Sequence, residues 1–223
     1  MTTGYFLAIE GIEGSGKTTQ VARLEQLIRA TGRNTTVTKE PGGTPLGNRI
    51  RAILLDPHEE GMDPYAELFL YAASRRQHVV ELIRPSLERG AVVLCDRFTD
   101  ATLAYQGFGR MIDLDRLRQI NEWATDGIRP DLTVILDIAE SVGLERARAR
   151  NVEKNLQGEG RLEGEDVRFH RRVREGYLAL AEAEPERYAV VDANGSTDEV
   201  FARLLATLRE RAGALRLPES ESA

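Results

Sequence analysis

A glycine-rich segment near the N-terminus constrains this chain more than any other feature: Gly11-Ile12-Glu13-Gly14-Ser15-Gly16-Lys17-Thr18. It fits the pattern G-x-x-x-x-G-K-[ST], and it lies between an apolar run at 5–9 and a stretch of helical apolar spacing that begins near residue 17. A strand that turns through glycines into a helix points successive backbone N–H groups at one place, where the helix N-terminus adds partial positive charge. The segment therefore predicts a phosphate-binding loop (P-loop) for a nucleoside triphosphate.

Side chains within the loop supply what a backbone nest lacks. Lys17 can reach the outer phosphates as a point charge, and the Thr18 hydroxyl can bind Mg²⁺ held between phosphate oxygens. Glu13 is unusual here, because a carboxylate repels the phosphates beside it unless a cation compensates. The expected contacts to the triphosphate are Gly11, Ile12, Glu13, Gly14, Ser15, Gly16, Lys17, Thr18 and Thr19.

The rest of the chain alternates between two kinds of segment. Further apolar runs rich in β-forming residues occur at 35–38, 91–95, 132–136 and 188–191. Helical spacing is found near 17–30, 46–55, 64–83, 99–106, 114–125, 141–150, 166–183 and 197–212. This alternation predicts an α/β fold. The runs at 91–95 and 132–136 are apolar at nearly every position, so we expect them to be central parallel strands covered by helices on both faces.

The length of 223 residues suits a single domain, which we place at 1–213. Residues 151–166 contain three glycines and several charges without apolar periodicity, and we expect them to form a movable lid. Residues 214–223 are expected to be a flexible tail. Trp123, close to Ile120 in the sequence, is expected to pack in the interior.

Composition narrows the environment and the class of partner. Cys95 is the only cysteine, so no internal disulfide can form, and a reducing compartment, the cytoplasm, is expected. The apolar runs are far shorter than the roughly 20 residues that a membrane span requires. A net charge of −6 gives no long-range attraction for nucleic acid. We therefore expect neither membrane nor nucleic acid as a partner, and a compact phosphate compound as the ligand.

The run at 91–95 ends in Asp96 and Arg97, at the sheet edge where open α/β folds bind ligands. Asp96 could hold Mg²⁺ directly or through water, and Arg97 could grip a phosphate with two hydrogen bonds. An ordinary ion pair at a strand end is the alternative. Asp137, a rival carboxylate for Mg²⁺, is interpreted as a strand-end or capping group. The chain has no Asn-Lys-x-Asp segment to read guanine, which disfavours a regulatory GTPase.

Several segments together resemble bacterial thymidylate kinases. They are Phe6-Leu7-Ala8-Ile9-Glu10-Gly11-Ile12-Glu13-Gly14, Glu40-Pro41-Gly42-Gly43-Thr44, Tyr71-Ala72-Ala73-Ser74-Arg75, Asp96-Arg97-Phe98, Ala104-Tyr105-Gln106-Gly107, Arg129-Pro130-Asp131-Leu132-Thr133 and Leu144-Glu145-Arg146-Ala147-Arg148-Ala149-Arg150. The resemblance runs from about residue 5 to about residue 210. It implies a three-layer P-loop NTPase fold with a five-stranded parallel sheet and a short lid. It also implies Mg²⁺-dependent transfer of the γ-phosphate of ATP to dTMP, giving dTDP, by a homodimer.

The resemblance assigns contacts with dTMP to Glu40, Arg51, Tyr71, Arg75, Arg97, Thr102, Tyr105 and Gln106. Tyr71 would stack on thymine, and Arg75 would donate to a carbonyl of the base. Thr102 and Gln106 would add the hydrogen bonds that discriminate between bases. Arg51 and Arg97 would hold the phosphate, and Glu40 would order Mg²⁺-bound water or the acceptor. The residues alone leave open a plain core tyrosine at 71 and a solvated helix arginine at 51.

Three residues are expected to be catalytic: Lys17, Arg97 and Arg161. In related enzymes without a basic P-loop side chain, an arginine of the lid completes the site, and Gly160-Arg161-Leu162-Glu163 resembles that lid segment. Arg148, Arg150 and Lys154 are the other basic candidates. The metal ligands are expected to be Thr18 and Asp96. Two alternatives remain: a kinase for another nucleoside monophosphate, such as dUMP, UMP or AMP, and a P-loop nucleotide-binding module without phosphotransfer.

Overall fold

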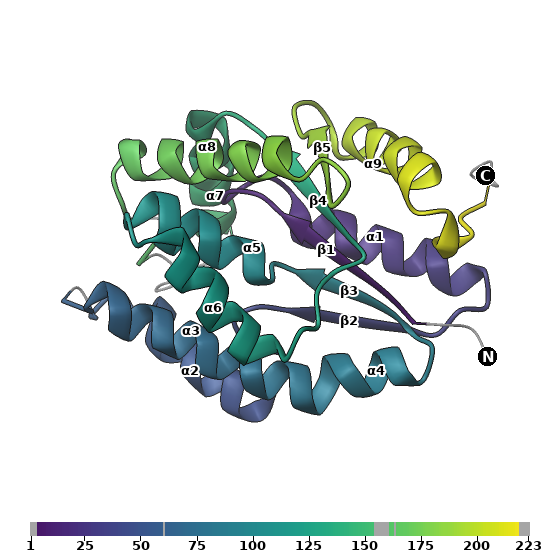
Figure 1. The fold of residues 1–223 in the computed structure, drawn as a ribbon. Helices are drawn as coiled ribbons and strands as arrows, with labels where there is room; N and C mark the ends of the chain where they lie inside the picture. The colour runs from purple at the N-terminus through teal and green to yellow at the C-terminus, as the bar shows by residue number, and fades with distance from the viewer. Residues whose placement is uncertain (1–3, 60, 154–160, 163, 219–223) are drawn as a thin grey trace.

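The computed structural model describes residues 4–59, 61–153, 161–162 and 164–218. A five-stranded, all-parallel sheet forms its centre, in the order β2-β3-β1-β4-β5 (Figure 1). The strands are β1 (Tyr5–Glu10), β2 (Thr35–Lys39), β3 (Val92–Asp96), β4 (Leu132–Asp137) and β5 (Tyr188–Asp192). The predicted α/β class is confirmed. β3 and β4 lie on either side of β1, as expected for strands that are apolar at nearly every position.

Helices connect the strands. They are α1 (Lys17–Ala30), α2 (Pro45–Leu55), α3 (Pro64–His78), α4 (Arg84–Glu88), α5 (Thr99–Thr102), α6 (Leu114–Thr125), α7 (Glu140–Glu153), α8 (Val167–Ala183) and α9 (Thr197–Arg211). Two π-helical turns, η1 (Val79–Ile83) and η2 (Leu103–Gly109), and a 3₁₀ turn, η3 (Gly213–Leu215), complete the described elements. The helix predicted over 64–83 therefore changes to π-helical geometry at 79, just before Pro85, which has no N–H to donate.

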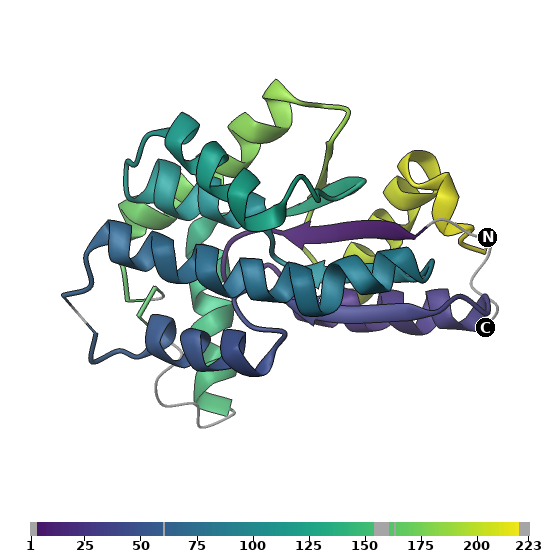
Figure 2. The same cartoon turned by 60° about the horizontal axis from the view of Figure 1, so that its bottom comes forward.

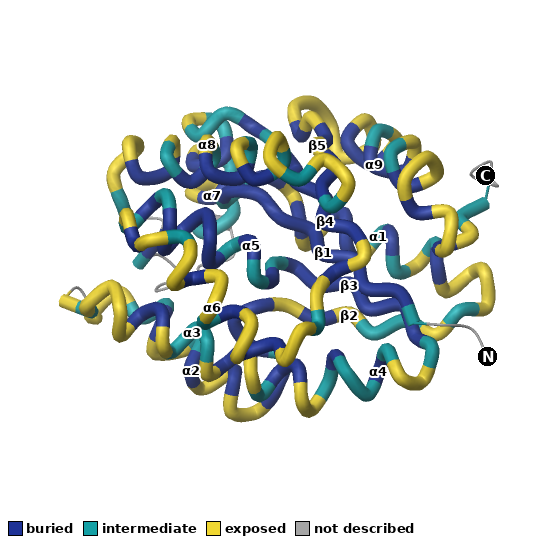
Figure 3. The backbone as a smooth tube through the Cα atoms, in the orientation of Figure 1, coloured by how far each residue is buried: buried dark blue, intermediate teal, exposed yellow. Residues whose placement is uncertain are grey.

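Alternate residues of β1 face the two helical layers that enclose the sheet. Leu7 and Ile9 belong to the larger core cluster, together with Leu24 and Ile28 of α1. Phe6 faces the other way and meets Phe98 edge to face, with ring centroids 4.9 Å apart. Figure 2 shows helices on both sides of the sheet, and in Figure 3 the buried strands occupy the middle of the molecule. This burial on both faces explains the nearly continuous apolar runs.

All five strands end one residue later than the apolar runs predict, each on a charged residue. These residues are Glu10, Lys39, Asp96, Asp137 and Asp192. Because the strands are parallel, their carboxyl ends meet at one edge of the sheet, where the P-loop also begins. The apolar core thus stops at this edge and gives way to polar chemistry.

The periphery differs from the sequence-based expectation in three places. α7 continues to Glu153, so the start of the predicted lid at 151–166 is helical, whereas 154–160 and 163 lie outside the described residues. In the segment predicted to be a flexible tail, Leu215 is buried and the Arg209 guanidinium donates to the carbonyl of Pro218, so residues 214–218 contact the rest of the fold. Trp123 is 77% exposed, so it does not pack in the core. Among the helices described, none has the length and apolar character needed to cross a membrane.

Candidate active site

A cleft of about 640 Å³ opens at the carboxyl edge of the sheet. It brings together the P-loop, the end of β3, η2 and the facing sides of α2 and α3. From the P-loop and the start of α1 it is lined by Glu13, Gly14, Gly16, Lys17, Thr18 and Thr19. All eight residues predicted to contact dTMP also line it: Glu40, Arg51, Tyr71, Arg75, Arg97, Thr102, Tyr105 and Gln106. The structure thus places both predicted half-sites in one cavity.

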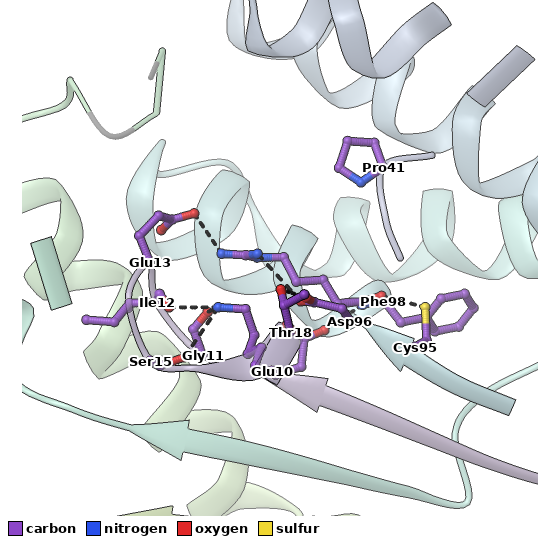
Figure 4. Close-up of polar contacts among 12 residues, drawn as sticks. Glu10, Gly11, Ile12, Glu13, Ser15, Thr18, Pro41, Cys95, Asp96 and Phe98 are labelled. Atoms are coloured by element: carbon purple, nitrogen blue, oxygen red, sulfur yellow. Dashed lines mark hydrogen bonds and ion pairs between the residues drawn. The ribbon is translucent and has the colours of Figure 1, made fainter. Parts of the chain in front are cut away.

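The remaining P-loop residues position Lys17. Its ammonium donates to the carbonyl oxygens of Gly11, at 3.0 Å, and Ile12, at 2.7 Å, and to Ser15 Oγ at 3.3 Å (Figure 4). Burial, with a smaller contribution from the nearby charge of Arg97, lowers the pKa of Lys17 to about 8. A bound anion would favour the charged form of this amine, so Lys17 would become fully protonated when a phosphate group binds beside it.

Gly14 is required by the packing of the loop on α7. Its φ is +72°, and a Cβ there would lie 1.9 Å from the carbonyl oxygen of Gly143. No side chain fits that space without moving backbone. The close approach of two glycines therefore fixes how the P-loop lies against α7.

Thr18 and Asp96 meet across the loop as a metal site would require. The Thr18 hydroxyl donates to Asp96 Oδ2 at 2.7 Å. Asp96 Oδ1 is buried and has no hydrogen-bond partner in the described part of the chain; the Arg97 guanidinium lies 3.8 Å away. An unused carboxylate oxygen beside a hydroxyl fits Mg²⁺, which prefers oxygen ligands and usually takes few from the protein. Elsewhere too, the described part of the chain contains no cluster of three or more His, Cys, Asp or Glu side chains that could hold a metal ion.

Glu13 bridges the two halves of the cleft. Its Oε1 lies 2.6 Å from an Arg97 nitrogen, and its Oε2 accepts a short hydrogen bond from the Tyr105 hydroxyl. Burial alone would raise the pKa of Glu13, but the charges of Arg97 and Lys17 and the hydrogen bond from Tyr105 outweigh it and hold the pKa below its usual range. We expected a lid arginine to compensate Glu13; in this structure Arg97 does so.

A buried network forms the wall behind the acceptor half. Arg75 is 1% exposed, with Nε donating to Glu40 Oε2 at 2.7 Å and Nη1 donating to Asn121 Oδ1 at 2.6 Å. The other oxygen of Glu40 lies 3.0 Å from His78 Nδ1. Burial opposes ionisation of Glu40, but Arg75 and His78 outweigh it, so the pKa of Glu40 is lowered. Arg75 and Glu40 are thus held rigidly, with both Glu40 oxygens already engaged.

The other acceptor residues also have defined positions. Tyr71 is half-buried and lines the cleft, so it is more than a tyrosine of the apolar core. Arg51 donates to the Pro41 carbonyl at 3.1 Å and lines the cleft, which distinguishes it from a solvated helix arginine. Thr102 Oγ1 is buried without a hydrogen-bond partner among the described residues, so it can bond to a ligand.

Arg161 lies away from the P-loop. Its Nε donates to the Leu54 carbonyl at 2.7 Å and its Nη2 donates to Glu67 Oε2 at 2.6 Å. Arg146 and Arg150 of α7 line the cleft instead. Arg148 is exposed, and Lys154 lies outside the described residues. A catalytic role for Arg161 stays a prediction that requires this arginine to leave Glu67.

Sequence reasoning missed three buried polar residues behind the cleft, Glu67, His78 and Asn121. Glu67 precedes Tyr71 by four residues, and His78 follows Arg75 by three, so both share a helix face with predicted site residues. That spacing was an available signal, whereas Asn121 arrives from α6 with no local indication. Asp137 ends β4 and forms a two-bonded ion pair with Arg174 at 2.7 and 2.9 Å, which confirms its strand-end role.

Comparison with known proteins agrees with this geometry. The family model described as thymidylate kinase matches residues 9–204. A thymidylate kinase of Syntrophotalea carbinolica is 52% identical over 96% of this chain and 98% of its own length, and one of Deinococcus radiodurans is 52% identical over 95% and 99%. The crystal structure of thymidylate kinase from Ehrlichia chaffeensis superposes with a TM-score of 0.73 at 34% identity, covering 92% of this chain and 99% of that one. The chain belongs to the thymidylate kinase family.

Proposed function

We propose that this cleft transfers the γ-phosphate of ATP to dTMP, giving dTDP, with ATP held by the P-loop and dTMP held against α3 and η2. The supporting observation is that the complete predicted acceptor set and the P-loop line one cavity at the carboxyl edge of the sheet. Glu13 and Arg97 lie where the two substrates would meet. Phosphoryl transfer requires such alignment, because positioning and charge stabilisation supply most of its catalysis.

Thr18 and Asp96 would hold Mg²⁺ in this site. An Mg²⁺ ion held by these two residues would supply positive charge to offset the negative charge that develops on the transferred group. The buried, unpartnered Asp96 Oδ1 is the feature of this structure that fits such an ion.

The chain's own cations would do the remaining work. Lys17 would neutralise the outer phosphates of ATP, and Arg97 would hold the phosphate of dTMP with Arg51. Glu13 keeps Arg97 turned toward the P-loop before substrate arrives. A general base is unnecessary, because a phosphate monoester is already ionised near neutral pH.

One assay tests the proposal. The protein is incubated with Mg²⁺ and ATP and with dTMP, dUMP, UMP or AMP in turn, and formation of ADP and of the nucleoside diphosphate is measured. We expect selective turnover of dTMP, with loss of turnover in Lys17→Ala. Turnover of a different monophosphate would support the alternative kinase, and binding of ATP without any turnover would support a nucleotide-binding module.

We further propose that the protein acts as a cytoplasmic homodimer. Tyr65, Phe69 and Val80 form an exposed apolar stripe along α3 and η1, and Trp123 is exposed on α6, which packs against α3. The Arg116 guanidinium of α6 donates to the Tyr65 hydroxyl at 3.3 Å. Clustered exposed aromatic residues are typical of protein interfaces. A second copy of this chain is the partner that the family resemblance implies. Cytoplasmic placement rests on the single, buried Cys95.

A further inference from the structure

Glu67 accepts hydrogen bonds from three side chains, which come from two separate segments at the wall of the acceptor half. It lies in the first turn of α3 and is 1% exposed. Its Oε1 accepts from Gln106 Nε2 at 2.7 Å. Its Oε2 accepts from Arg161 at 2.6 Å and from Arg110 at 3.2 Å. Neither the P-loop motif nor the predicted acceptor contacts account for this buried carboxylate.

The surroundings of Glu67 keep it ionised. Burial raises its pKa, but the hydrogen bond from Gln106 and the charges of Arg110 and Arg161 outweigh burial, so the pKa lies below its usual value. Arg110 is itself held, by an ion pair with Glu165 at 2.7 Å and by the Phe169 ring, whose centroid is 4.9 Å away. If Arg161 left Glu67, Arg110 would therefore remain as its positive partner.

An ionised carboxylate accepts hydrogen bonds and cannot donate them. The Gln106 carboxamide must therefore turn its NH₂ group toward Glu67, because the reverse orientation would press two oxygens together. Gln106 lines the cleft, and its Oε1 receives no hydrogen bond from the described residues. The amide oxygen is consequently the atom that Gln106 can offer to a ligand.

We propose that Glu67 is a positioning residue, which fixes the Gln106 carboxamide with its oxygen available to the acceptor base and so selects a pyrimidine that carries an N–H. Thymine and uracil have such a donor at N3, whereas cytosine has a bare nitrogen lone pair there. With cytosine, the N3 lone pair would face the Gln106 amide oxygen, so two acceptors would meet. A site built for a hydrogen bond rejects such a mismatch strongly. The inference rests on the proposed function only in taking a pyrimidine nucleotide as the acceptor.

Glu67→Gln tests this role, because an amide at 67 can either donate or accept and no longer dictates the orientation of Gln106. We expect kcat/KM for dTMP relative to dCMP to fall about tenfold or more. The change in the ratio should reside in KM for the acceptor, with KM for ATP within about twofold of wild type. Glu88→Gln, the same chemical change at an exposed position of α4, should leave the ratio unchanged.

A purely structural role for Glu67 would weaken both pyrimidine nucleotides alike and preserve their ratio, which would overturn the proposal. Gln106→Met, which removes the carboxamide, should also collapse the ratio, and adding Glu67→Gln to it should change the ratio no further. This second variant decides the question if Glu67→Gln does not fold, because an unchanged ratio in Gln106→Met refutes the role of the amide. If the wild type binds both nucleotides without turnover, the proposed function fails, and the same ratio is then measured from calorimetric Kd values.

Discussion

The Arg97 guanidinium lies 2.6 Å from the Glu13 carboxylate and ties the end of β3 to the middle of the P-loop. Arg97 adopts a left-handed backbone conformation, with φ of 69°, which is uncommon for a side chain of its size. Such conformations persist where the surrounding structure demands them and cluster at functional sites. The P-loop thus carries a carboxylate whose counterion, Arg97, lies in the half of the cleft that we propose for the acceptor.

Replacing Arg97 should show how strongly activity depends on its ion pair with Glu13. We expect Arg97→Ala to lower kcat/KM about 10²–10³-fold, because it deletes a phosphate ligand and leaves Glu13 uncompensated beside ATP. Adding Glu13→Gln should then restore part of the ATP affinity, since the uncompensated charge is gone. Steady-state kinetics of both single variants and the double variant measure the effect. Strictly additive losses would show that the two residues act independently.

Lys17 should link ATP binding to proton uptake. Its pKa in the free protein is about 8, below the ordinary value of 10.5, and bound phosphates favour the ammonium. Between pH 8 and pH 10.5 the Lys17 amine of the free protein is only partly protonated. ATP binding therefore takes up part of a proton, and ATP affinity falls as pH rises. The unfolded chain also binds more protons at Lys17 in this window, so its contribution to folding stability rises with pH.

Calorimetry at pH 8.5–9 in buffers of different ionisation enthalpy measures that uptake. Lys17→Arg, which stays charged throughout, should abolish it. Glu10 needs its own control, because burial, together with the charge of Asp100, raises its pKa to about 8 as well. Glu10→Gln should retain the uptake, and a normal uptake in Lys17→Arg would exclude Lys17 as its source.

Asp96 should determine the metal requirement. We expect Asp96→Asn to raise the Mg²⁺ concentration for half-maximal activity about 10–100-fold, because a charged ligand oxygen is lost. Asp137→Asn is the matched control, since Asp137 ends β4, on the other side of β1, but is engaged by Arg174. Mg²⁺ titrations at saturating substrates measure the difference. An equal shift in both variants would point to a general change of charge rather than to a ligand.

The features of this fold that produce a short, local sequence pattern could be predicted from the sequence. The three central strands were visible because each is buried on both faces, and the P-loop because three glycines, a lysine and a hydroxyl occur in fixed order. The strand ends were placed one residue short, since apolarity stops where the sheet edge becomes polar. The acceptor residues gather in one cleft, as the family resemblance implies.

Long-range pairings could not be predicted in the same way. Nothing near Glu13 in the sequence indicates Arg97 as its partner, because 84 residues separate them and the left-handed turn at Arg97 has no local signature. Trp123 looked like a core residue because apolarity alone does not distinguish a core from an interface. Leu215 is buried by contacts with elements distant in sequence, which a tail of mixed composition does not announce.

The basic residues around the lid can be separated by kinetics. We expect Arg161→Ala to lower kcat by about 10³-fold while both KM values change little, the pattern of an interaction made in the transition state. To act in the transition state, Arg161 must leave Glu67, so the contacts that it makes in this structure are not its proposed catalytic contacts. Arg150→Ala is the comparison, because Arg150 already lines the cleft. An unaffected kcat in Arg161→Ala with a large loss in Arg150→Ala would transfer the role to Arg150.

The exposed aromatic face of α3 and α6 should control oligomeric state. We expect wild-type protein to have twice the chain mass of 24.8 kDa in sedimentation or light-scattering measurements. Phe69→Arg should yield the monomer, because an arginine in the middle of an apolar interface would be buried without a partner. Val152→Arg places the same charge at an exposed position of α7 and should leave the dimer intact. A wild-type mass of 24.8 kDa at all concentrations would show that this face does not bind a second copy.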